Sequence, residues 1–116
     1  MARAQQIRDQ ATVQTWLRGL REQWGEEPSD WEDRLEALAG FCAFVSKHPD
    51  AVIEECVRES DSGKRISVKG RRFYNDKIAE WQASLAGDRA AQVRAGNAVR
   101  SFLIHNGIFL QSGLQA

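Results

Sequence analysis

The sequence has few of the residues that interrupt or cross-link a fold. It contains two prolines, two cysteines and one tyrosine in 116 residues. With 42% hydrophobic and 28% charged residues, this composition excludes a disordered or fibrous protein. No run of about 18 apolar residues is present, and MARAQQIRDQ lacks the apolar stretch of a signal peptide. We therefore expect one folded, cytoplasmic domain without a membrane segment.

Cysteine and histidine are too scattered to indicate a metal site. Cys42 and Cys56 lie in helical patterns beside apolar residues, where a free cysteine usually packs as a small hydrophobic side chain. There is no CxxC motif, and the positions of His48 and His105 relative to the cysteines match no recognisable zinc-binding spacing. We expect no disulfide, no metal and no cofactor.

Motifs for catalysis are also missing. The sequence has no GxSxG, no glycine-rich phosphate-binding loop and no HExxH. Tyr74 is a candidate nucleophile, but in a helical pattern a tyrosine ring more often packs in a core. Acidic residues crowd the expected helix starts, where the helix dipole favours them, and a solvated surface accounts for them. We expect no catalytic residue in this chain.

Apolar residues recur at helical spacing in three segments of the first half. The apolar faces consist of Val13, Trp16, Leu17, Leu20 and Trp24, then Leu35, Leu38, Cys42 and Val45 widened by Phe41 and Phe44, then Val52, Ile53, Cys56 and Val57. The expected start signals are Thr12, a capping box at Ser29-Asp30-Trp31-Glu32, and Pro49, and the expected ends are Gly25 and a point near Glu59.

The second half predicts two further helices after one basic loop. The loop spans residues 60–72 and contains SDSGKRISVKGRR, and we expect it to be mobile. The fourth helix carries Phe73 or Tyr74, then Ile78, Trp81 and Leu85, and stops at Gly87; the fifth is capped by Asp88, faces inward with Ala95, Val99, Phe102 and Leu103, and stops at Asn106-Gly107. A strand pattern competes only weakly, around residues 108–110. The expected fold is all-α, a compact bundle of four to five helices.

Charge is distributed unevenly along a chain that is neutral as a whole. Residues 1–61 hold seven Lys/Arg against thirteen Asp/Glu, a net charge of −6, and residues 62–116 hold nine against three, a net charge of +6. A basic face can hold phosphate groups even on a neutral molecule, so this asymmetry indicates nucleic-acid or membrane contact. The alternative is an ordinary solvated surface.

The last helical segment resembles a known family. DRAAQVRAGNAVRSFLIHNGI is similar to the end of the core-binding, SAM-like domain of tyrosine recombinases (phage integrases). The matching residues are Val93, Asn97, Ala98, Val99, Arg100, Ser101, Phe102, Asn106, Gly107 and Ile108. ATVQTWLRGL and WEDRLEALAGFCAFV resemble the first two helices of that domain, so the resemblance covers most of residues 11–110.

The resemblance implies a module for DNA integration and recombination that clamps one side of duplex DNA. The family's catalytic residues lie in a following domain, so this chain would be non-catalytic, with residues 1–10 as a flexible segment, 11–110 as the core-binding domain and 111–116 as a tail toward an absent catalytic domain. Its partners would be double-stranded DNA, the catalytic domain and other recombinase subunits, and we expect a monomer when free.

Two sets of residues are predicted to contact DNA. From the last helix these are Arg89, Gln92, Arg94, Asn97 and Arg100, whose side chains suit phosphates or base edges. From the basic loop and beyond they are Lys64, Arg65, Lys69, Arg71, Arg72 and Lys77, assigned to phosphates. The small residues Ala90, Ala91, Ala95 and Gly96 would keep the last helix slim enough for close approach to DNA.

A helical protein-interaction module without nucleic acid is the alternative. Its acidic and basic halves would attract one another in head-to-tail assembly, and tryptophans would serve as exposed anchors. The candidate anchors are Trp16, Trp24, Trp31 and Trp81. A small helical enzyme is a third and more distant hypothesis.

Overall fold

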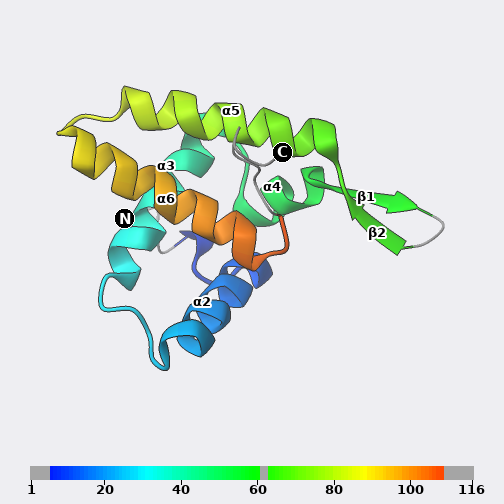
Figure 1. Ribbon diagram of the computed structural model, residues 1–116, viewed down its shortest axis with the longest axis horizontal. Coiled ribbons are helices and arrows are strands. Elements are labelled where there is room, and N and C mark those ends of the chain that lie inside the picture. The colour runs from blue at the N-terminus through cyan, green and yellow to red at the C-terminus, as the bar shows by residue number, and fades with distance from the viewer. Residues whose placement is uncertain (1–5, 61–62, 109–116) are drawn as a thin grey trace, which may run out of the picture.

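Each of the five segments with helical periodicity contains a helix in the structure. The computed structural model describes residues 6–60 and 63–108. In chain order the elements are α2 (Ala11–Trp24), α3 (Trp31–Val45), α4 (Pro49–Glu55), β1 (Val57–Ser60), β2 (Gly63–Ile66), α5 (Val68–Ser84) and α6 (Arg89–His105). Helices α5 and α6 run antiparallel, α2 and α3 pack on α6, and the hairpin lies beyond the first turn of α5 (Figure 1). The predicted all-α bundle is confirmed.

Helix α2 forms at the predicted apolar stripe, although its first turn is held differently. Four of the five predicted inward residues are buried, Trp24 being the exception, and Gly25 ends the helix in the left-handed region at φ 81°. The residue before the helix is Gln10, which makes no side-chain cap, so the prediction that Thr12 caps α2 is wrong. The backbone N–H and the hydroxyl of Thr12 both donate to the Asp50 carboxylate. Asp50 therefore ties the start of α2 to α4.

Helix α3 begins without the predicted capping box. Asp30 precedes it but makes no cap, and its Oδ1 instead accepts a hydrogen bond from Arg34 Nε at 2.9 Å. The predicted inward residues Leu35 and Leu38 are buried. Phe44, which was expected to widen the apolar face, is 43% exposed. Phe41, the other residue predicted to widen this face, is fully buried, so the prediction is confirmed for Phe41 and wrong for Phe44.

The third predicted helix is shorter than expected, because a β-hairpin replaces its end. Helix α4 starts at Pro49, as predicted, and stops at Glu55 instead of near Glu59. Strands β1 and β2 then pair antiparallel, with Val57 opposite Ile66. The prediction of a loop over residues 60–72 is wrong for the described part of that range. The strand sequences VRES and GKRI each contain a single large apolar residue, so neither shows the alternation that predicts a strand, and this accounts for the error.

Helix α5 starts inside the predicted loop. Its N-cap is Ser67, whose Oγ accepts a hydrogen bond from the Gly70 N–H at 3.0 Å. Tyr74 points inward and is 1% exposed, whereas Phe73 is 48% exposed. The structure thus selects Tyr74 of the two aromatic residues that the periodicity left open. The helix ends before Gly87, as predicted, with Leu85 as its C-cap.

Helix α6 lies at the centre of the bundle and contacts α2, α3 and α5. Its start and end follow the prediction, because the Asp88 carboxylate accepts from the Ala91 N–H at 2.8 Å and Gly107 follows the helix at φ 88°. Phe102 is fully buried, and its ring centroid lies 5.6 Å from that of Trp16. Trp81 is buried too, as predicted. No helix within the described ranges combines the length and apolarity needed to cross a membrane.

Candidate nucleic-acid interface

The hairpin and the first turns of α5 gather basic residues at one end of the molecule. Arg65 lies on β2, and Lys69, Arg71 and Arg72 lie near the start of α5. Arg71 is half-buried and the other three are exposed. We call these four residues the basic end. No acidic residue occupies the first turn of α5, so the cations add to the positive end of the helix dipole. Such a surface can hold phosphate groups.

A glycine allows the basic end to form. A Cβ placed on Gly70 would lie 2.1 Å from the backbone carbonyl oxygen of Glu55, far inside van der Waals contact. The Ser67 N–H also donates to the Cys56 carbonyl at 2.8 Å. The start of α5 therefore lies directly against the end of α4, and the cations of α5 lie beside the hairpin. The sequence showed this glycine only as a loop signal.

Two of the predicted phosphate contacts do not join the basic end. The Lys64 side chain lies outside the part of the structure that is described. Lys77 lies two turns into α5, where its Nζ is 3.4 Å from Glu80 Oε1 and 5.6 Å from the centroid of the Phe73 ring. Lys77 is therefore already engaged with neighbours on its own helix.

The predicted α6 residues divide between solvent and neighbouring helices. Arg89, Arg94 and Asn97 are exposed, as the helical wheel predicts. Gln92 and Arg100 are only half-exposed. Residues on one helix thus differ in their access to a large ligand.

The two half-exposed residues hold α5 and α6 together. Gln92 Nε2 donates to the Leu85 carbonyl at 2.8 Å, across the turn between the helices. Arg100 Nη1 donates to Gln82 Oε1 at 3.0 Å and to Asn97 Oδ1 at 3.3 Å. Partial burial lowers the pKa of Arg100 from its ordinary value, which still leaves the guanidinium charged at neutral pH. Both side chains would have to give up these bonds to contact DNA.

Small residues of α6 serve helix packing more than an open approach to DNA. Gly96 is buried, and a Cβ there would lie 1.8 Å from Gln82 Oε1 on α5. Ala91 and Ala95 line a cleft against α3. Of the four small residues predicted to admit DNA, Ala90 is exposed. The small side chains of α6 therefore allow α3 and α5 to pack close to it.

The basic end and the exposed start of α6 lie far apart. Because α5 and α6 are antiparallel, Arg89 lies at the end of the pair away from the hairpin (Figure 1). A helix of the length of α5 spans about 25 Å at about 1.5 Å per residue. The predicted DNA-contacting residues thus form two separate surfaces.

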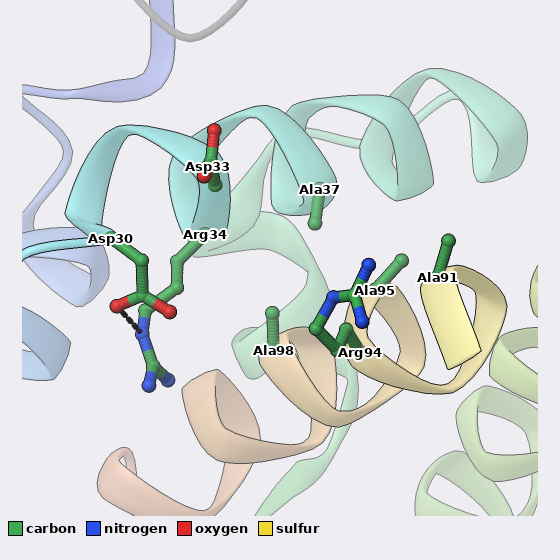
Figure 2. Close-up of a pocket in the computed structure, with 8 residues that line it drawn as sticks. All are labelled: Asp30, Asp33, Arg34, Ala37, Ala91, Arg94, Ala95 and Ala98. Carbon is green, nitrogen blue, oxygen red and sulfur yellow. Dashed lines mark hydrogen bonds and ion pairs between the residues drawn. The ribbon is translucent and has the colours of Figure 1, made fainter.

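The surface at the start of α6 is bordered by acidic residues. A cleft of about 270 Å³ separates α3 from α6 and is lined by Asp30, Asp33, Arg34, Ala37, Ala91, Arg94, Ala95 and Ala98. Figure 2 shows Arg94 rising from α6 toward α3, with the Asp30–Arg34 ion pair on the other side of the cleft. A phosphate near Arg94 would also meet the carboxylates of α3. Electrostatics therefore favour the basic end over this cleft for binding a polyanion.

Tyr74 is enclosed by the fold. Its hydroxyl donates to Glu55 Oε1 at 2.6 Å, and burial together with this bond raises the pKa of Tyr74 well above its ordinary value. Cys42 and Cys56 are both free and buried, and burial raises their pKa values to about 12 and about 11. None of the three groups is poised as a nucleophile. Within the described ranges no three His, Cys, Asp or Glu residues lie together as a metal site.

The exposed aromatic residues differ from those that the sequence indicated. Trp16, Trp31 and Trp81 are buried, so they are not the exposed anchors of the alternative hypothesis. Trp24, which was placed on the inward face of α2, is 50% exposed, with the Arg34 guanidinium 5.2 Å from its ring centroid. Among the residues that the structure describes, Phe44 and Phe73 are the other large exposed rings. Helical spacing predicts Phe44 to be inward and leaves Phe73 open, whereas both lie at the borders of apolar faces and are exposed.

No family model matches the chain, and no match was found among curated proteins or among solved structures. The resemblance to recombinase core-binding domains therefore stays a prediction that depends on the residues quoted above.

Proposed function

We propose that this chain is a non-catalytic DNA-binding module, which holds duplex DNA chiefly through the basic end. The observation that carries the proposal is the gathering of Arg65, Lys69, Arg71 and Arg72 where β2 meets the start of α5. Lys69 and Arg72 are exposed and form no ion pair with any described residue. Their charges are therefore available to phosphates.

The proposed role within DNA integration rests on the resemblance to tyrosine recombinases. A module of this kind would clamp one side of the duplex while a separate catalytic domain acts on the other. The enclosed position of Tyr74 supports a positional role, because the phenol cannot reach a phosphodiester. In this proposal phosphate contacts supply affinity, and Asn97 is the exposed α6 side chain that suits a base edge.

The test is a titration with duplex DNA between about 50 and about 200 mM salt, where phosphate binding weakens steeply. Replacing Lys69 and Arg72 with glutamine should weaken binding and lower the slope of log K against log salt by about 1.8, or about 0.9 per contact. Replacing Arg89 and Arg94 should have a smaller effect, because α3 carboxylates border that surface.

A matched control separates local contact from bulk charge. Arg18→Gln with Arg21→Gln removes the same charge from α2, at exposed positions far from the basic end along the chain. Equal weakening by this pair and by Lys69→Gln with Arg72→Gln contradicts the proposal, as does absence of DNA binding by the parent chain at low salt. Asn97→Ala should change preference among DNA sequences more than overall affinity.

The second candidate function is a protein-interaction module, favoured by an apolar groove beside the exposed Phe44. Its rim is acidic, so the groove repels DNA and suits a basic protein surface. The tryptophan anchors expected in that hypothesis are not available, apart from Trp24.

A further inference from the structure

An open apolar groove lies on α3 where the ends of α5 and α6 meet it. It has a volume of about 670 Å³. Its apolar lining includes Ala37, Gly40 and Phe44 from α3, and Trp81 and Leu85 from the end of α5. The small residues leave room for a bulky side chain to enter, and the exposed ring of Phe44 offers it apolar contact beside the buried Trp81.

The rim of the groove is negatively charged. Asp33 and Glu36 lie one turn apart on α3, both are exposed, and both line the groove. Neither forms an ion pair with a described residue, in contrast to Asp30, which pairs with Arg34. An apolar side chain flanked by cations would match both the lining and the rim.

The chain itself carries such a side chain. Phe73 is 48% exposed, with Lys69 one turn before it and Lys77 one turn after it on α5. The Lys77 ammonium lies 5.6 Å from the Phe73 ring centroid, so the cation and the ring already form one unit.

The phenylalanine and the groove lie along the same side of α5. Phe73, Lys77 and Trp81 follow one another at intervals of four residues within α5. Each side chain is turned by about 40° from the one before, so the stripe curves from the exposed Phe73 toward Trp81 at the groove. Phe73 and Trp81 are about 12 Å apart along the helix axis at about 1.5 Å per residue. One face of the molecule therefore holds both a projecting ring and a groove that can receive one. That arrangement is self-complementary under a two-fold axis.

We propose that two copies of this chain pair through this face, each placing Phe73 in the groove of the other. The ring contacts Phe44 of the second copy beside the edge of Trp81. Lys69 faces Asp33 and Glu36 across the rim, and Lys77 exchanges its contact with Glu80 for the same two carboxylates. The pairing goes beyond DNA binding and does not depend on it. It also replaces the expectation of a free monomer. Because Lys69 belongs to the basic end, DNA and the second copy compete for it.

The test is sedimentation velocity of the full chain without DNA, over a wide range of protein concentration. The mass should rise from monomer to dimer, with weaker association in high salt because the rim pairs are screened. Phe73→Ala and Phe44→Ala should each weaken the association by about tenfold or more, as truncation of a central apolar contact does. Trp24→Ala is the matched control, since that exposed ring lies on α2, and it should leave association unchanged.

Charge reversal makes the test specific to this pairing. Asp33→Lys with Glu36→Lys should weaken dimerisation, and so should Lys69→Glu with Lys77→Glu, because like charges then meet at the rim. The variant with all four changes should dimerise again. Circular dichroism and melting of each variant establish that it is folded.

The possible results either support or overturn the proposed pairing. Restored dimerisation of the four-change variant, with the control variant behaving like the parent, supports the proposal. A parent chain that stays monomeric at every concentration overturns it, and so does association that is insensitive to Phe73→Ala. Because no DNA is present, either result leaves the proposed DNA binding to its own titration.

Discussion

Gly70 offers a test of how the basic end is held, because the backbone of Glu55 occupies the space that a side chain at this position would need. A Cβ at this position would lie 2.1 Å from the carbonyl oxygen of Glu55 and 3.3 Å from the Cα of Cys56. Neither atom can rotate away, so Gly70→Ala must push the start of α5 off the end of α4. Overpacking of this kind costs about 1 to 3 kcal/mol or more, and alanine recovers about 1 kcal/mol of helix propensity.

The contact distance places the cost at the upper end of that range, so we expect a net loss of about 2 kcal/mol in the free energy of unfolding. Denaturant titration followed by circular dichroism measures this loss, and the melting temperature should fall by about 4 °C or more per kcal/mol. If the Lys69 and Arg72 side chains depend on this docking, DNA affinity should fall as well in conditions where the variant is folded.

Gly96→Ala is the matched control, with the same substitution in a helix of the same length. The new methyl group would meet the end of the Gln82 side chain, which can rotate away, and the Arg100 Nη1 atom at 2.8 Å. The loss of the Gln82–Arg100 hydrogen bond costs about 1 kcal/mol and is offset by the gain in helix propensity. Stability should therefore stay within about 1 kcal/mol of the parent. A Gly70→Ala variant as stable as Gly96→Ala would refute the reasoning.

Two further predictions concern the core. Phe102→Ala should cost about 3 to 5 kcal/mol, measured by denaturant unfolding, because the ring is fully buried against Trp16; a variant that melts like the parent would contradict the inward face of α6. Tyr74→Phe tests the pKa of Glu55, which is lowered chiefly by the Tyr74 hydrogen bond. Because the pKa of Glu55 is lower in the folded state, the ionised carboxylate stabilises the fold above the unfolded pKa, and this stabilisation is lost as the pH falls. The loss of stability caused by Tyr74→Phe should therefore be smaller at about pH 3 than at about pH 6. A destabilisation that is the same at both pH values would show that the bond does not depend on the Glu55 charge.

The sequence alone predicts a helix boundary where that boundary depends only on residues next to it in the chain. Asp88 caps α6, Pro49 starts α4, and Gly25 and Gly107 follow α2 and α6 with positive φ, as the sequence predicts. In each case the groups involved lie within one helical turn along the chain, so no distant partner alters the outcome. The same holds for the buried stripe of α2, where an amphipathic period of 3.6 leaves one inward face.

Long-range partners determined the boundaries that the sequence analysis missed. Thr12 is a good capping residue by type, but its hydroxyl donates to Asp50, 38 residues away. The choice between the neighbouring rings of Phe73 and Tyr74 also depends on a distant residue. Tyr74 is the buried one, and its hydroxyl donates a hydrogen bond to Glu55. A buried phenol needs such a partner, which helical periodicity does not reveal.

For the candidate site, too, the sequence determines one property and the packing of the helices another. Basic residues are concentrated after residue 61 in the amino-acid order itself, and this is enough to predict a positive surface. Their separation into a basic end and the start of α6 follows from the antiparallel packing of α5 and α6. The acidic border near Arg94 comes from α3, about 60 residues earlier in the sequence. Which cations can reach a phosphate therefore depends on packing between helices, and neither composition nor periodicity contains that information.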